Sequence, residues 1–159
     1  AGYPKNNGVE PIISRADQVD SKFSITPSGD DSKGDILTVS FMPFGGSFTQ
    51  DCLGQSGTTT KGLIVNNYFV QNKQLMCRGS GNTVAQPIAE AVDNMQDLYG
   101  VDTDGDGFTD QYQKAADVGS WLDVASIQVA LLINSIDNVK DVAPGAGNTD
   151  QFNLLGQNH

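Results

Sequence analysis

The chain has 159 residues, of which 38% are hydrophobic and only 18% are charged. This length predicts one domain, which can bury about 68–70% of its unfolded surface, so its core needs no metal or disulfide. The formal net charge is −10, from 19 acidic and 9 basic residues. Because phosphate backbones and anionic lipids would be repelled, the charge argues against nucleic-acid binding and makes cations the more natural ionic partners.

The two cysteines, Cys52 and Cys77, bear on the compartment. Small polar residues and glycine fill much of the chain, a composition typical of a secreted β-rich protein with long polar loops. An oxidising compartment favours a disulfide between the two cysteines, whereas a cytosolic protein would hold two free thiols. A disulfide would stabilise the fold by about 3.5 kcal/mol on the chain-entropy estimate.

The first half of the chain predicts strands separated by polar loops. Residues 1–25 are largely irregular, with isolated apolar anchors. In chain order, the further elements are a loop at 26–35, a strand at 36–42, a loop at 53–62, a strand at 63–70, a turn at 71–72, a strand at 73–77 and a loop at 78–86. The last two strands would form a hairpin that brings Cys77 back towards Cys52.

The second half predicts both helix and strand. Pro87 can begin a helix, and Ile88, Val92 and Met95 follow at helical spacing, so we expect a short helix over residues 87–95. In chain order, we then expect a strand through Leu98, Tyr99 and Val101, a return strand at 110–113, a turn of helix at 115–121, a strand at 123–135 and largely irregular chain at 138–159.

The most informative segment is the acidic loop DTDGDGFTD, from Asp102 to Asp110. Its carboxylates repel one another unless a cation or solvent relieves them. In an EF-hand Ca²⁺ loop, positions 1, 3 and 5 supply side-chain oxygens and position 6 is Gly. The loop places Asp102, Asp104 and Asp106 at positions 1, 3 and 5, and Gly107 at position 6. The pattern therefore indicates a Ca²⁺ site.

The rest of the loop departs from an EF-hand. Phe108 would supply a backbone carbonyl and Asp110 stands at the ninth position, but Gln113 takes the place of the bidentate Glu at position 12. A shortened loop of this kind would bind Ca²⁺ weakly, with a Kd on the order of 10⁻⁴–10⁻³ M. The alternative is a bare hairpin tip, in which the Asp-Gly pairs only supply turn geometry.

Catalysis finds little support in the sequence. The one histidine is His159, the last residue, which argues against Ser-His-Asp and Cys-His schemes. A glycosidase needs two carboxyl groups across a cleft, and no pair of residues points to one. Tyr99 and Trp121 flank the acidic loop and could form an aromatic ligand platform, although core packing is the plainer interpretation.

Several short motifs form a family pattern between residues 35 and 135. In the second half they are IAEAVDNMQ at 88–96, LYGVDTDGDG at 98–107, Trp121 followed by Val124, and VALL at 129–132. In the first half they are DILTV at 35–39, DCLG at 51–54, FV at 69–70 and LMC at 75–77. Together with the cysteine spacing, these motifs resemble the PilW family of type IV pilus minor pilins.

The resemblance implies an α+β fold, a pilin-like head dominated by antiparallel β-sheet with one or two short helices, as one domain over residues 1–159. It also implies a structural subunit, not an enzyme, which helps to prime or cap pilus assembly with other minor pilins and the major pilin. Family members begin with a leader and an apolar helix that anchors them in the inner membrane. We therefore expect a segment upstream of Ala1 and a final location in the cell-surface pilus, reached through the periplasm.

The chain departs from the family pattern after the VALL motif. Family members usually continue into a basic segment and a final strand, whereas this chain closes on Gly156, Gln157, Asn158 and His159. Either the last strand is missing or the tail diverges, which would leave an unpaired sheet edge. A secreted Ca²⁺-dependent adhesin or carbohydrate-binding module is the rival class, because it also accounts for the acidic loop, the disulfide and the polar surface.

Overall fold

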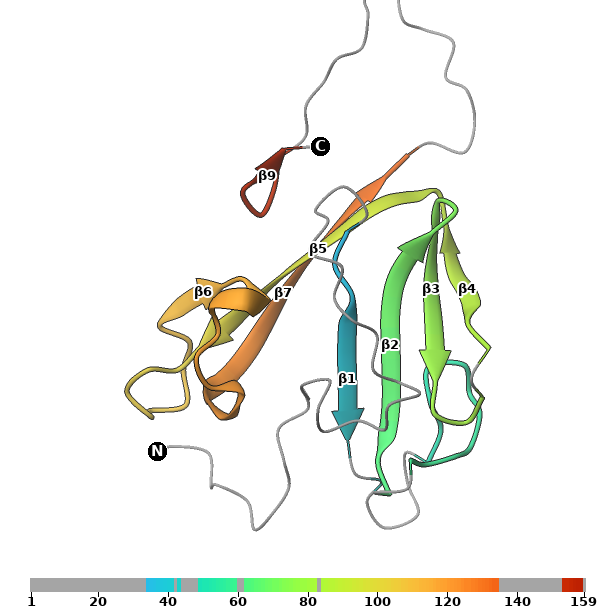
Figure 1. Ribbon diagram of the computed structural model, residues 1–159, viewed down its shortest axis with the longest axis horizontal. Helices are drawn as coiled ribbons and strands as arrows, with labels where there is room; N and C mark the ends of the chain where they lie inside the picture. The colour runs from blue at the N-terminus through green and yellow to red at the C-terminus, as the bar shows by residue number, and fades with distance from the viewer. Residues whose placement is uncertain are drawn as a thin grey trace, which may run out of the picture.

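A computed structural model describes residues 34–41, 43, 49–59, 62–82, 84–134 and 153–158. In these residues the chain forms nine β-strands and two short 3-10 helices (Figure 1). The predictions for residues 1–33 and 138–150 lie outside the described residues.

The first sheet has four antiparallel strands in the order β1-β2-β3-β4. Its strands are β1 (Leu37–Phe41), β2 (Ile64–Gln71), β3 (Gln74–Gly79) and β4 (Gln86–Glu90). The predicted strands at 36–42, 63–70 and 73–77 are confirmed as β1, β2 and β3. The predicted turn at 71–72 is one residue early, because Gln71 pairs with Gln74 and the turn residues are Asn72 and Lys73, with φ of 53° and 60°.

The second sheet has three antiparallel strands in the order β6-β5-β7. Its strands are β5 (Val92–Val101), β6 (Gln111–Gln113) and β7 (Val124–Ile133), and the 3-10 helices η1 (Ala115–Asp117) and η2 (Trp121–Asp123) connect the last two. A separate hairpin joins β8 (Asn153–Leu154) to β9 (Gln157–Asn158). The predicted strand at 123–135 is confirmed as β7, and the return strand at 110–113 as β6.

The predicted helix over residues 87–95 is wrong. Pro87 lies in β4, an edge strand, where its missing N–H costs no hydrogen bond. Ala91 then adopts a φ of 58° and turns the chain into β5. The helical spacing is a coincidence, because Ile88 is 45% exposed while Val92 and Met95 are buried. The described residues hold no α-helix, so the α+β class is confirmed only in its antiparallel β part.

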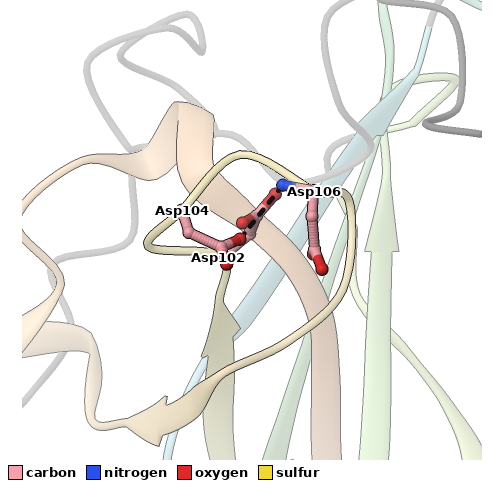
Figure 2. Close-up of side chains that lie close together, drawn as sticks. All are labelled: Asp102, Asp104 and Asp106. Atoms are coloured by element: carbon pink, nitrogen blue, oxygen red, sulfur yellow. Dashed lines mark hydrogen bonds between the residues drawn. The ribbon is translucent and has the colours of Figure 1, made fainter.

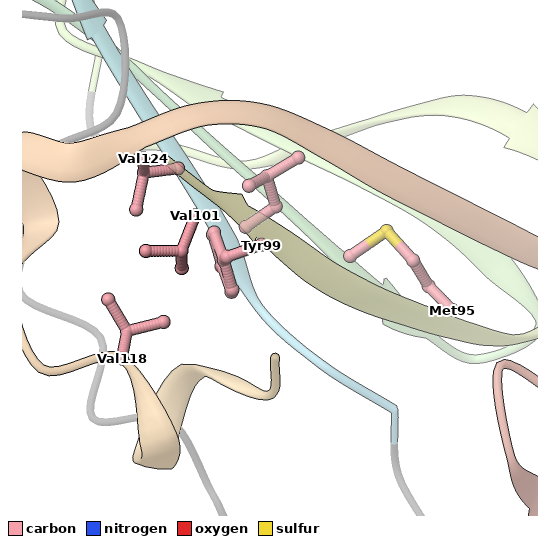
Figure 3. Packing of buried hydrophobic residues seen from close by; sticks show 6 residues of the cluster. Met95, Tyr99, Val101, Val118 and Val124 are labelled. Atoms are coloured by element: carbon pink, nitrogen blue, oxygen red, sulfur yellow. The ribbon is translucent and has the colours of Figure 1, made fainter. Parts of the chain in front are cut away.

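The hydrophobic core lies where β1 and β5 meet. Its buried members are Leu37, Met95, Tyr99, Val101, Val118 and Val124, and Figure 3 shows the cluster around β5. Tyr99 and Trp121 pack edge to face, with ring centroids 4.8 Å apart and an interplanar angle of 72°. Because Tyr99 is buried and Trp121 packs against the same cluster, the core interpretation of these two rings is confirmed.

Candidate metal centre

The acidic loop is fixed at one end to η2 and at the other to β5. At its start, the Asp102 amide donates to the Asp123 carbonyl at 2.8 Å. At its end, the Asp110 amide donates to the Val101 carbonyl at 3.0 Å. The loop therefore leaves β5 and returns into β6 as a closed unit at one end of the sheet (Figure 1).

The Asp102 carboxylate organises the loop from inside. Its Oδ1 accepts the Gly105 amide at 2.7 Å, and its Oδ2 accepts the Gly107 amide at 2.8 Å. Both glycines have φ in the left-handed region, at 82° and 90°, which any side chain would disfavour. The hydrogen bonds, led by the one from Gly107, hold the pKa of Asp102 below its ordinary value and keep the group charged.

Asp104 and Asp106 each accept a backbone amide two residues further along the loop. Oδ1 of Asp104 accepts the Asp106 amide at 3.2 Å, and Oδ1 of Asp106 accepts the Phe108 amide at 2.8 Å. One carboxylate oxygen from each of Asp102, Asp104 and Asp106 can be chosen so that all three lie within 4.8 Å of one another (Figure 2). Three hard oxygen donors at this spacing fit the chemistry that Ca²⁺ requires.

The other predicted ligands take different places. Asp110 accepts hydrogen bonds from the Thr103 hydroxyl at 2.6 Å and the Thr103 amide at 2.8 Å, which hold the pKa of Asp110 below its ordinary value. Both bonds go to Oδ2 and close the loop, and Asp110 lies outside the group of three clustered carboxylates. Phe108 lies in the loop with a side chain that is 70% exposed. Gln113 lies in β6 opposite Tyr99, so the sheet takes up the position where an EF-hand has its last ligand.

The predicted disulfide joins Cys52 to Cys77, with their Cα atoms 6.5 Å apart. Cys77 lies in β3 and is fully buried, and the Cys52 amide donates to Asn66 Oδ1 on β2 at 2.9 Å. The disulfide therefore ties the loop before β2 to β3, and the hydrogen bond ties it to β2.

Sequence reasoning missed two buried acidic residues. Asp51 accepts hydrogen bonds from the amides of Leu53, Gln55 and Gly81. Asp97 lies in β5 among core residues with only 6% of its surface exposed. The DCLG motif carries a turn signal that could have found Asp51, because Asp often bonds the amide two residues on. No local signal marks Asp97, because its burial depends on how the sheets pack.

A type IV pilus-assembly protein W family model matches residues 59–159, which is more than half of the chain. The chain therefore belongs to the type IV pilus-assembly protein W family, and its part in type IV pilus assembly follows from that membership. Comparisons with curated proteins and with solved structures returned no match. Among the described residues, no helix has the length and apolar character that crossing a membrane would require.

Proposed function

We propose that the chain is the head of a minor pilin that helps to prime or cap the type IV pilus through contacts with other minor pilins and the major pilin. The family match over residues 59–159 is the observation that carries this proposal, because it spans the second sheet, the acidic loop and every strand of the first sheet except β1. An apolar helix upstream of Ala1 would anchor the subunit in the inner membrane and then pack in the fibre. The role is structural and needs no catalysis.

Mass spectrometry of the native protein tests this proposal. Pili sheared from the source cells should contain peptides of this chain, together with an N-terminal peptide that carries an apolar stretch of about 20 residues. Recovery of the protein only as a freely secreted form that begins near Ala1 would contradict the pilin role and favour the secreted binding module.

The acidic loop is proposed to bind Ca²⁺ through Asp102, Asp104 and Asp106, with Asp110 and the Phe108 carbonyl as further candidate ligands. The converging carboxylates at the tip support this role. A bound cation would offset the repulsion among these carboxylates and stiffen the loop at a contact with a neighbouring subunit. Calcium would act here as a structural ion.

The calcium proposal is tested by thermal unfolding with millimolar Ca²⁺ against EDTA. Ca²⁺ should raise the Tm of the natural sequence, and isothermal titration should give a Kd on the order of 10⁻⁴–10⁻³ M. Replacing Asp104 and Asp106 by Asn should abolish both effects. Asp117→Asn is the matched control, because Asp117 is exposed on η1 outside the loop. Equal Tm values in Ca²⁺ and EDTA for the natural sequence would contradict the proposal.

A further inference from the structure

Asp35 and Asp97 form a contact between the two sheets. The Asp35 amide donates to the Met95 carbonyl at 2.7 Å, and the Asp97 amide donates to Asp35 Oδ2 at 2.8 Å. Asp35 lies two residues before the start of β1 of the first sheet, while Met95 and Asp97 lie in β5 of the second. These two hydrogen bonds therefore fasten the chain that enters β1 to the middle of β5.

The chain packs closely on β5 at this point. A Cβ at Gly34 would lie 2.8 Å from Asn94 Oδ1 and 2.9 Å from the Met95 carbonyl oxygen. The φ of Gly34 is 80°, which also favours glycine. Asp35 is therefore held against β5 by the backbone on which it stands, and its carboxyl group cannot easily turn away from Asp97.

Asp97 is an acidic residue at a core position. Met95, Asp97 and Tyr99 alternate along β5, so they share one face of the strand, and both neighbours of Asp97 belong to the core. Its Oδ2 is buried and has no hydrogen-bond donor within the described structure, and the Asp35 carboxyl that accepts the Asp97 amide is the acidic group beside it. A buried Asp97 carboxylate beside the partly exposed Asp35 carboxylate is costly to keep charged. A proton on the pair removes the repulsion and gives the orphan oxygen a hydrogen bond.

The surrounding elements offer few other charges. Tyr99, on the same strand, hydrogen-bonds the Asp97 carboxyl and stabilises its charged form. β1 and β7 carry no charged side chain, and β7 sets Val129 opposite Asp97. On β2, Tyr68 packs against the core, but the acidic group that acts on it is Asp51. On β3, Arg78 is not among the groups that act on Asp97. Asp35 is therefore the dominant charged neighbour.

We propose that the Asp97 carboxyl carries a proton that it donates to Asp35, and that this hydrogen bond latches the chain before β1 onto β5, so that the sheets hold together in mild acid and loosen as the pH rises. This pair is called the Asp35–Asp97 latch below. Burial, followed by the contact with Asp35, raises the pKa of Asp97 to about 7. Because the folded pKa of Asp97 lies above its unfolded value, folding takes up a proton at any pH between these two pKa values. The folding equilibrium constant should therefore fall by up to about tenfold per pH unit from roughly pH 4 to 7, then level off.

Denaturant unfolding from about pH 5 to 8 tests the latch. The natural sequence should lose stability across this range, whereas Asp97→Asn should show a flat profile, because its amide can donate to Asp35 without titrating. Asp35→Asn should make the slope shallower without abolishing it, because burial alone still raises the pKa of Asp97. Asp117→Asn should keep the natural slope, because Asp117 is exposed on η1. An unchanged slope in both Asp97→Asn and Asp35→Asn would overturn the proposal.

Measurements on the natural sequence keep the test decisive if neither variant folds. Carboxyl ¹³C NMR should show Asp97 titrating well above the ordinary Asp value of about 3.9. Hydrogen exchange, corrected for intrinsic rates, should show the Asp35 and Asp97 amides losing protection as the pH rises. The Ser80 amide, which donates to the Val65 carbonyl at 2.9 Å within the first sheet, is the control. Titration of Asp97 in the ordinary range, or equal loss of protection at Ser80, would overturn the latch.

Discussion

Asp51 Oδ2 accepts a hydrogen bond from the Gly81 amide at 2.8 Å, across 30 residues of sequence. Oδ1 of the same carboxylate accepts the Leu53 and Gln55 amides, so one buried side chain closes a local turn and fastens it beyond the end of β3. The disulfide from the adjacent Cys52 reaches Cys77 in β3. A covalent bond and a hydrogen-bond network thus fix the same loop to the first sheet.

Gly79→Ala should disturb this network directly. A Cβ at Gly79 would lie 2.0 Å from Asp51 Oδ2, so the carboxylate must shift and weaken its bond to Gly81. We expect a loss of about 1–3 kcal/mol in the free energy of unfolding, measured with denaturant. Gly119→Ala is the control, because a Cβ there meets no atom within 4 Å. Equal free energies of unfolding for the two variants would contradict a stabilising role for the hydrogen bond from Gly81 to Asp51.

Reduction of the disulfide should destabilise the head. The bond restricts the unfolded chain between Cys52 and Cys77, so its loss should lower the free energy of unfolding by about 2–4 kcal/mol. The measurement compares Tm with and without a thiol reductant. A double Cys→Ser variant should show the Tm of the reduced protein both with and without reductant. A reductant-sensitive Tm in that variant would contradict the assignment.

A fall in pH should destabilise the acidic loop, whereas it should stabilise the Asp35–Asp97 latch. The pKa values of Asp102 and Asp110 are lowered in the folded state by hydrogen bonds from Gly107 and Thr103, respectively. Their contribution to stability is therefore present above the unfolded Asp value of about 3.9 and is lost as the pH falls through the folded values. Thr103→Val should raise the pKa of Asp110, which carboxyl ¹³C NMR can measure. No change in that titration would contradict the role of the Thr103 hydroxyl.

Phe108→Ser should separate assembly from stability. The side chain is 70% exposed at the loop tip, so its removal should change the free energy of unfolding by less than about 0.5 kcal/mol. If the loop contacts a neighbouring subunit, the same change should reduce the number of surface pili. Val84→Ser is the control, because Val84 is 62% exposed and lies next to β4. Normal piliation in Phe108→Ser would place the subunit contact elsewhere.

Sequence patterns predicted three of the four strands of the first sheet. β1 and β2 are rich in β-branched and aromatic residues, and a tight turn leads from β2 into β3. The patterns failed at β4 and at the start of β5, which were predicted as one helix. In β5, Asn94, Gln96 and Asp97 are buried among apolar neighbours. These polar residues hide the period of a strand and leave Val92 and Met95 to suggest a helix. Tertiary packing decides this strand, since β6 and β7 pair with it on both sides.

The acidic clusters also differ in how far the sequence predicts them. The clustering of Asp102, Asp104 and Asp106 follows from local Asp-Gly spacing, which the sequence displays directly. The pairing of Asp35 with Asp97 joins residues 62 positions apart, and no local pattern encodes it. Local turn chemistry could therefore be predicted, whereas contacts between the sheets required the folded chain.

The central claim, a structural role in type IV pilus assembly, is tested most directly by counting surface pili in cells that lack this protein. Sheared pili, quantified through the major pilin, should fall sharply in the deletion strain and return when the full-length protein is supplied. Unchanged pili in the deletion strain, with the major pilin present at its normal level, would contradict the account.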